Sequence, residues 1–244
     1  MLALGAALWT LLLNGGTLAL NSAFDNDTGD IGYLDSPPPV PAKLWLFALV
    51  LMFAGLPLSL LLLPNIYTAA YLASVVLSLL YSCPPVRLKA RAGFDILVNT
   101  AGYGALTTFA GWASVSSEVS APIVMVCAGY MLLFAAFYPL TQIYQYEDDR
   151  AKGDSTFAVV LGPVRALQFS TAALLCAFVL FALAVSPAGH LPYLALALAL
   201  AAWLAVLVPW LLKGRAYPEK KGMYRALWVW GATDVLVVVA FAVV

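Results

Sequence analysis

Eight apolar segments constrain the fold of this chain more than any other feature. A helix needs about 20 apolar residues to cross the hydrocarbon core of a bilayer, and these segments are close to that length. They are residues 1–22, 43–63, 67–84, 96–115, 121–141, 164–185, 192–212 and 226–243. Only 10% of the residues are charged and the mean hydropathy is +0.93, which excludes an ordinary soluble domain. We therefore predict an all-α, multi-pass integral membrane protein of about eight transmembrane helices, in contact with membrane lipid.

The basic residues are distributed on one side of the predicted membrane topology. Alternate threading of the eight segments places loops 23–42, 85–95, 142–163 and 213–225 on the same side. All twelve Lys and Arg residues lie in or beside these loops. The positive-inside rule makes this side cytoplasmic. The net charge of zero gives no basis for a nucleic-acid partner.

Two polar motifs with the same spacing follow apolar segments, and every matched pair is 124 positions apart. Spacing by four places the leading amide and the carboxylate one turn apart on a helix face, and the glycine is expected to end the helix. We interpret the repeat as two related halves of one domain, approximately residues 1–120 and 121–244. The motifs are Asn21-xxx-Asp25-xxx-Gly29-Asp30 and Gln145-xxx-Asp149-xxx-Gly153-Asp154.

The side chains of the two motifs offer oxygen ligands, with no Cys or His among them. Such ligands suit Mg²⁺, which commonly binds one or two carboxylates together with substrate phosphate. Basic side chains nearby would neutralise a diphosphate. The alternative is that these are solvated loop acids and topology-setting cations. The candidate metal ligands are Asn21, Asp25, Asp27, Asp30, Gln145, Asp149 and Asp154, and the candidate diphosphate ligands are Arg87, Lys89, Arg91, Arg150 and Lys152.

Three stretches give the chain a resemblance to the UbiA superfamily of intramembrane prenyltransferases. They are NSAFDNDTGD at 21–30, YSCPPVRLKARAGFD at 81–95 and YEDDRAKGDSTFAVVLG at 146–162. The third is the most specific, because an acidic run, a basic and glycine turn and a helix start follow one another. The resemblance covers most of the chain.

The resemblance implies a helical bundle with a central cavity open to the cytoplasmic side. It also implies Mg²⁺ and an isoprenyl diphosphate held by two Asp-rich motifs, and transfer of the prenyl group to a lipophilic acceptor. Asn21, Asp25 and Asp149 match motif positions and become catalytic candidates, while Arg87 and Lys89 match the loop that contacts diphosphate. Asp95 either orients this loop or acts as a base toward the acceptor, and it is the fourth catalytic candidate.

The chain departs from the family pattern in three places. The family's first motif usually has Asp where Gly29 stands, with the acid here displaced to Asp30. The second motif usually begins with Asp, where this chain has Gln145. Family members usually have nine helices, with the first motif after the second, whereas here it follows the first. The resemblance therefore leads us to expect either an absent N-terminal helix or a start assigned too far along the chain.

Two other functions remain open at the level of sequence. One is terpene cyclisation, in which the same ionisation is followed by intramolecular attack without an acceptor. The other is a transporter or lipid-binding membrane protein, because repeats also occur in transporters. Asp234, inside the last apolar segment, is either functional or hydrogen-bonded structurally to a neighbouring helix.

Overall fold

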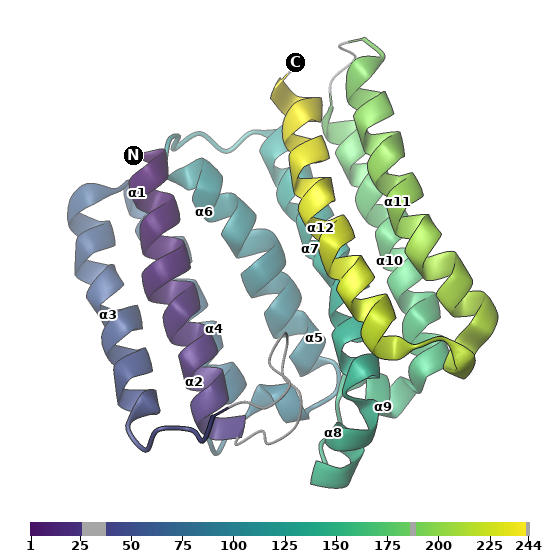
Figure 1. Cartoon of the computed structure of the whole chain (residues 1–244). Coiled ribbons are helices and arrows are strands. Elements are labelled where there is room, and N and C mark those ends of the chain that lie inside the picture. Colours follow the sequence, from purple (N-terminus) through teal and green to yellow (C-terminus); the bar gives the residue numbers. More distant parts are fainter. Residues whose placement is uncertain (26–37, 186–188, 243–244) are drawn as a thin grey trace. The chain divides into compact units, whose positions relative to one another are not determined.

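The computed structural model describes residues 1–25, 38–185 and 189–242, and these residues form helices joined by short connections (Figure 1). The chain divides into two compact units. The first comprises Met1–Leu88 and Phe109–Glu118, and the second comprises Lys89–Thr108 and Val119–Val244. No β-strand occurs in the described ranges, where a single bridge joins Arg91 to Ser155. The all-helical prediction is therefore confirmed.

Seven helices are long and apolar enough to cross a membrane, as judged by length and composition over the described residues. The predicted segment 96–115 is the exception. It is helical from Phe94 to Ala113, with a π-helical stretch at Thr100–Leu106. Asp95 and Asn99, together with several glycines and threonines, make this segment less apolar than the other seven. The seven spans are Leu2–Asp25, Leu44–Leu62, Asn65–Ser82, Ala121–Tyr144, Pro163–Ala184, Leu191–Ala216 and Glu219–Ala242.

Three long helices make up most of the described part of the first unit. The N-terminal helix is formed by α1 (Leu2–Ala7), the π-helical η1 (Leu8–Asn14) and α2 (Gly15–Asp25), and it packs on α3 (Leu44–Leu62) and α4 (Asn65–Ser82). Two buried tyrosines of α4 connect these helices. The hydroxyl of Tyr67 donates to the Gly5 carbonyl oxygen at 2.7 Å, and that of Tyr71 donates to the Met52 carbonyl oxygen at 3.2 Å. These bonds satisfy polar groups that lipid would leave without partners. The unit also includes most of α6 (Thr107–Ala113).

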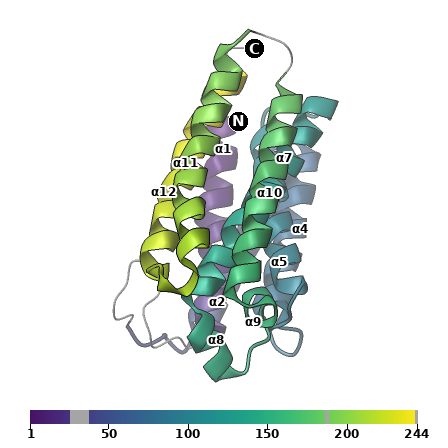
Figure 2. The same cartoon turned by 90° about the vertical axis from the view of Figure 1, so that its right-hand side faces the viewer.

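The second unit is built around four long helices that lie side by side in Figures 1 and 2. Aliphatic and aromatic side chains fill the space between them, including the fully buried Leu140, Phe181 and Trp203. Short helices connect or precede the long ones at one end. The elements are η2 (Leu88–Ala90, whose first residue belongs to the first unit), α5 (Phe94–Asn99), η3 (Thr100–Leu106), α7 (Ala121–Tyr144), α8 (Tyr146–Lys152), α9 (Phe157–Leu161), α10 (Pro163–Ala184), α11 (Leu191–Lys213), η4 (Gly214–Ala216) and α12 (Glu219–Ala242).

The outer faces of the helices carry large apolar side chains. Leu61 and Leu212, for example, are 78% and 83% exposed. Extended apolar exposure of this kind is unfavourable in water and suits contact with lipid. The structure thus agrees with the prediction of an integral membrane protein.

A glycine allows η3 and α7 to approach closely. A Cβ atom added at Gly104 would lie 2.6 Å from the Met131 Cα atom and 2.8 Å from the Tyr130 carbonyl oxygen. Because the obstructing atoms belong to the backbone, we expect Gly104→Ala to destabilise the protein by about 1–3 kcal/mol. Gly102→Ala is the matched control, since nothing lies within 4 Å of its added Cβ. Thermal unfolding of both variants in the same detergent measures the difference. Equal melting temperatures would contradict the close approach.

Candidate active site

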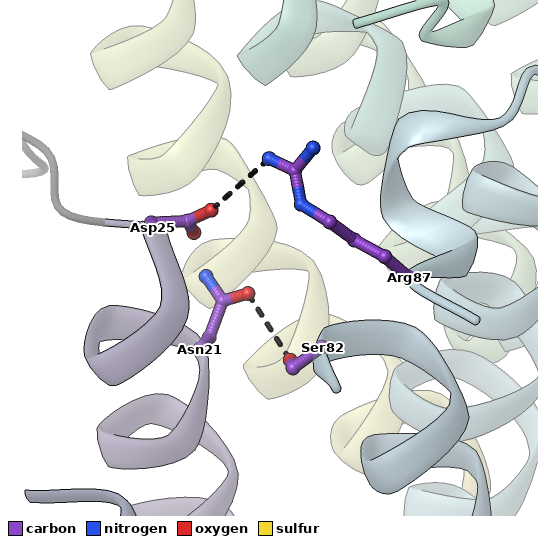
Figure 3. A network of polar contacts seen from close by, with 4 residues as sticks. All are labelled: Asn21, Asp25, Ser82 and Arg87. Atoms are coloured by element: carbon purple, nitrogen blue, oxygen red, sulfur yellow. Dashed lines mark hydrogen bonds and ion pairs between the residues drawn. The ribbon is translucent and has the colours of Figure 1, made fainter. Parts of the chain in front are cut away.

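The first motif lies at the end of α2, where Asn21 and Asp25 are one helical turn apart (Figure 3). The Asn21 side-chain oxygen accepts a hydrogen bond from the Ser82 hydroxyl at 3.3 Å. The Asp25 carboxylate lies 3.9 Å from the Arg87 guanidinium, which comes from the connection after α4. The predicted amide and carboxylate therefore share one helix face, and they lie beside a predicted diphosphate ligand. The other first-motif candidates, Asp27 and Asp30, are outside the described residues.

Arg87 has an unusual backbone conformation. Its φ is +39°, in the left-handed region that side chains other than glycine rarely occupy. The conformation costs about 1–3 kcal/mol, and such costs are most common at functional positions. The backbone here turns so that the guanidinium faces Asp25 (Figure 3).

The second motif begins at the joint between α7 and α8, and its glycine follows the end of α8. The Asp149 amide donates to the Gln145 carbonyl oxygen at 2.9 Å, so these two residues are one helical turn apart. Gly153 follows α8 with φ +77°. The Gly153 amide donates to the Arg150 carbonyl oxygen at 3.1 Å, and the Asp154 amide donates to that of Asp149 at 3.0 Å. A left-handed glycine with two such bonds is a common helix ending. The expected glycine stop is present in this copy.

Thr156 contacts the central acid of the second motif. Its hydroxyl donates to the Asp149 carboxylate at 3.2 Å, and its side chain is buried. Thr156 was not predicted as a site residue from the sequence, because a threonine at the start of a helix is ordinarily explained as a helix cap. No such cap hydrogen bond forms from Thr156 to α9.

Asp95 is fully buried at the start of α5, with its carboxylate surrounded by N–H donors. One oxygen accepts from its neighbour Ile96 at 2.8 Å. The other accepts from the Gln142 side-chain amide at 2.7 Å and from the Phe157 backbone amide at 2.6 Å. Burial raises the pKa of Asp95, whereas the hydrogen bonds from Gln142, Phe157 and Ile96 act in the opposite direction. The structure thus buries Asp95 and bonds it to Gln142 of α7 and to the start of α9, which follows the second motif in the sequence.

The basic segment 89–91 is bonded to the turn after the second motif. The Ser155 amide donates to the Ala90 carbonyl oxygen at 3.1 Å, and Arg91 pairs with Ser155 in a parallel bridge. Lys89, another predicted diphosphate ligand, is only 8% exposed. Within the second unit, therefore, backbone pairing holds the basic segment beside the acidic turn.

Two arginines contact one tyrosine on α8. The Arg150 guanidinium lies 5.6 Å from the centre of the Tyr146 ring, and that of Arg215, from η4, lies 6.0 Å away. These distances are typical of cation–π contacts. Lys152, the remaining predicted basic ligand, is exposed at the end of α8. Arg215 was not selected from the sequence, because nothing in its local context connects it with residues 146–150.

A cavity of about 560 Å³ lies beside this cluster. It opens between the ends of α7, α8, α10 and α12, and its lining mixes aromatic and charged side chains. The lining residues are Tyr144, Tyr146, Glu147, Pro163, Arg215, Tyr217, Pro218, Glu219 and Lys220.

The donor set fits a hard cation such as Mg²⁺ in its chemistry. Asn21 and Asp25 offer an amide and a carboxylate oxygen in one unit, and Gln145, Asp149 and Asp154 offer the same donor types in the other. Among the described residues, no three His, Cys, Asp or Glu side chains converge on one point. Mg²⁺ usually keeps several waters and binds substrate phosphates, so a protein site of one or two carboxylates suffices.

Asp234, the acid inside the last apolar segment, has aromatic hydrogen-bond partners. It lies on α12 and interacts with Tyr130 of α7 and with Trp230 of its own helix. The contact with Tyr130 joins α12 to α7, as the structural alternative requires.

The fold and these residues define a multi-helix membrane protein with acidic and basic side chains gathered at helix ends. Comparison with protein families matches residues 1–231 to the UbiA prenyltransferase family. The chain belongs to this family, and the resemblance predicted from its motifs is confirmed.

Individual relatives agree with the family assignment. A lycopene elongase/hydratase from Halobacterium salinarum is 36% identical over 114 residues, which is 46% of this chain and 40% of that protein. A structure of a UbiA homologue from Archaeoglobus fulgidus bound to GPP and Mg²⁺ has a TM-score of 0.71 at 20% identity, covering 99% of this chain and 87% of the other. A structure from work on digeranylgeranylglyceryl phosphate synthase has a TM-score of 0.63 at 16% identity, with coverage of 99% and 85%. These two structures support the fold.

Proposed function

We propose that this protein transfers a prenyl group from an isoprenyl diphosphate to a lipophilic acceptor inside the membrane, in a Mg²⁺-dependent reaction. One observation carries the proposal: each acidic motif lies against a basic segment. In the first unit Asp25 faces Arg87, and in the second the turn after Asp154 is bonded to residues 90–91. Membership of the UbiA family and the GPP and Mg²⁺ bound by the Archaeoglobus fulgidus homologue support it.

Each polar group has a role in this proposal. In the first unit Asn21 and Asp25 would bind Mg²⁺, and in the second unit Asp149 would do so, with Gln145 and Asp154 completing the second motif. When bound, Mg²⁺ supplies positive charge where negative charge develops on the departing diphosphate. Basic side chains of each unit would neutralise phosphate oxygens. They are Arg87 in the first unit and Lys89, Arg91, Arg150 and Lys152 in the second.

The transfer requires one bond to break and one to form. The bond between the prenyl C1 atom and the diphosphate oxygen breaks, and its electron pair leaves with diphosphate. An electron pair of the acceptor then forms a bond to C1 of the allylic cation, and the acceptor releases a proton to water or to diphosphate. Apolar surroundings limit capture of the cation by water.

We propose an apolar polyene as the first acceptor to test, and the cytoplasmic side as the location of the polar loops. The name of the Halobacterium salinarum relative, lycopene elongase/hydratase, supports a carotenoid-type acceptor. The location rests on the distribution of Lys and Arg, because all twelve lie in or beside the loops of one predicted side.

Purified protein in lipid nanodiscs tests the proposal. Dimethylallyl, geranyl and geranylgeranyl diphosphate are supplied as donors, with and without lycopene and with either MgCl₂ or EDTA. We expect Mg²⁺-dependent release of diphosphate and a prenylated product detected by mass spectrometry. A cyclic hydrocarbon formed without acceptor would favour terpene cyclisation instead. Diphosphate release that is unaffected by EDTA would contradict the role of Mg²⁺.

A further inference from the structure

We infer that Asp95, Gln142 and Thr156 form a buried positioning network that orients Asp149 for metal and diphosphate binding. None of the three acts on substrate directly. This inference rests on the proposed function, because that proposal makes Asp149 a metal ligand. It also replaces the two sequence-based alternatives for Asp95 with a third role.

The Asp95 carboxylate has no surface available for an acceptor. The side chain is 0% exposed, and its two oxygens accept hydrogen bonds of 2.6–2.8 Å from Ile96, Gln142 and Phe157, with the Gly93 backbone as a further donor. A general base must lie within hydrogen-bond reach of the proton that it removes. Here the nearest groups are protein N–H donors from three separate segments, so the carboxylate serves to join those segments.

Gln142 can take only one orientation in this network. Its side-chain oxygen accepts from the Ala158 backbone amide at 3.1 Å, so its NH₂ group must face Asp95. Asp95 and Gln142 thereby bind the amides of Phe157 and Ala158, which are the first two of α9. These amides have no partner within the helix. The start of α9 is therefore fixed by side chains from α5 and α7.

The fixed start of α9 determines the position of Thr156. Thr156 directly precedes Phe157, and its hydroxyl donates to the Asp149 carboxylate at 3.2 Å. The residue before it, Ser155, is bonded through its amide to Ala90 in the basic segment. A continuous set of bonds thus runs from Asp95 through the 155–157 backbone to Asp149. Outer partners of metal ligands typically change metal affinity or activity by about 10- to 100-fold when they are removed.

Asp95→Asn is a sharp test, because the partners of the carboxylate are N–H donors. In either orientation, the Asn NH₂ group faces at least one N–H. We expect about a 10-fold or greater rise in the Mg²⁺ concentration needed for half-maximal diphosphate release. Stabilisation by MgCl₂ with inorganic diphosphate, measured as a shift in melting temperature, should fall in parallel. Without any metal, hydrogen exchange at the amides of residues 155–158 should accelerate.

Two further variants separate positioning from catalysis. Thr156→Val replaces the hydroxyl with a methyl group and should raise the Mg²⁺ requirement with little change in melting temperature. The double variant Asp95→Asn with Gln142→Glu exchanges the two groups, so the Asn NH₂ group at position 95 can donate to a carboxylate oxygen at position 142. The other carboxylate oxygen at position 142 can still accept from the Ala158 amide. This double variant should recover part of the loss, since the Phe157 amide remains poorly matched. If Asp95 were a catalytic base, Asp95→Asn would instead lower kcat even at saturating Mg²⁺. The added Gln142→Glu substitution would then not restore kcat.

Leu174→Ala is the control for loss of stability alone. Leu174 is fully buried on α10 and has no part in the network. Its truncation should lower the melting temperature and leave the Mg²⁺ requirement unchanged. If Asp95→Asn behaves in the same way, the positioning role is wrong. If wild-type protein and Asp149→Ala show equal diphosphate release, the proposed function fails, and the hydrogen-exchange result still decides whether the network holds the turn.

Discussion

Replacement of Asp25 or Asp149 by Ala is expected to lower Mg²⁺-dependent diphosphate release by more than about 100-fold. Loss of an outer partner of a metal ligand already costs about 10- to 100-fold, and these two residues are proposed as ligands themselves. Each lies on a helix at the position that matches the other in the repeat. Initial rates over a range of MgCl₂ concentrations measure the effect, because weakened metal binding shifts the curve before it lowers the maximum.

Asp148→Asn provides a matched control for this prediction. Asp148 is adjacent to Asp149 on α8 but is exposed, and the first motif has Phe24 at the corresponding position. We expect its rate to stay within about threefold of wild type, as for an exposed side chain outside the site. Equal losses for Asp148→Asn and Asp149→Ala would show a general effect of acidic charge. Wild-type rates for Asp25→Ala and Asp149→Ala would refute the assignment of both motifs.

Replacement of Arg87 by Gly is expected to separate substrate binding from stability. Loss of a hydrogen bond to a charged group costs about 1.5–3 kcal/mol, which corresponds to roughly a 10- to 150-fold higher KM for the isoprenyl diphosphate. The fold should not suffer, because glycine adopts the φ of +39° without the strain that Arg87 carries. Steady-state kinetics and thermal unfolding of the same preparation measure the two effects.

Arg87→Lys and Arg87→Ala complete this comparison. Lysine restores the charge without the planar guanidinium, so its KM should be intermediate. Alanine removes the charge and keeps an unfavourable positive φ, so it should raise KM as glycine does and melt at a lower temperature than the glycine variant. A KM for Arg87→Gly equal to that of wild type would show that Arg87 pairs with Asp25 for stability alone.

The helices and the motif spacing were the parts of this structure that the sequence could predict. The helices of the apolar segments were predictable, because helix length and apolar composition are local properties. The segment 96–115 was predicted as a span, whereas Phe94–Ala113 is helical but not among the seven most apolar helices. The spacing of Asn21 and Asp25 placed them on one helix face, as found. The equivalence of the two halves remains a prediction.

The contacts around the candidate site could not be predicted from the sequence. Asp95 was selected because it follows the basic loop, with two roles left open. Its partners Gln142 and Phe157 lie 47 and 62 positions away in the sequence. Thr156 and Arg215 resemble ordinary helix-start and loop residues until their neighbours are known.

The sequence alone thus determined the membrane class, the repeated acidic motifs and the family resemblance, because each depends on composition or on spacing within one helix. Only the tertiary structure decided that Asp25 faces Arg87, that Thr156 contacts Asp149 and that Asp95 is enclosed by N–H donors. The physical reason is that these contacts depend on how helices pack and on where the backbone turns, as at Arg87. Local periodicity carries no information about which distant donors will meet a given carboxylate.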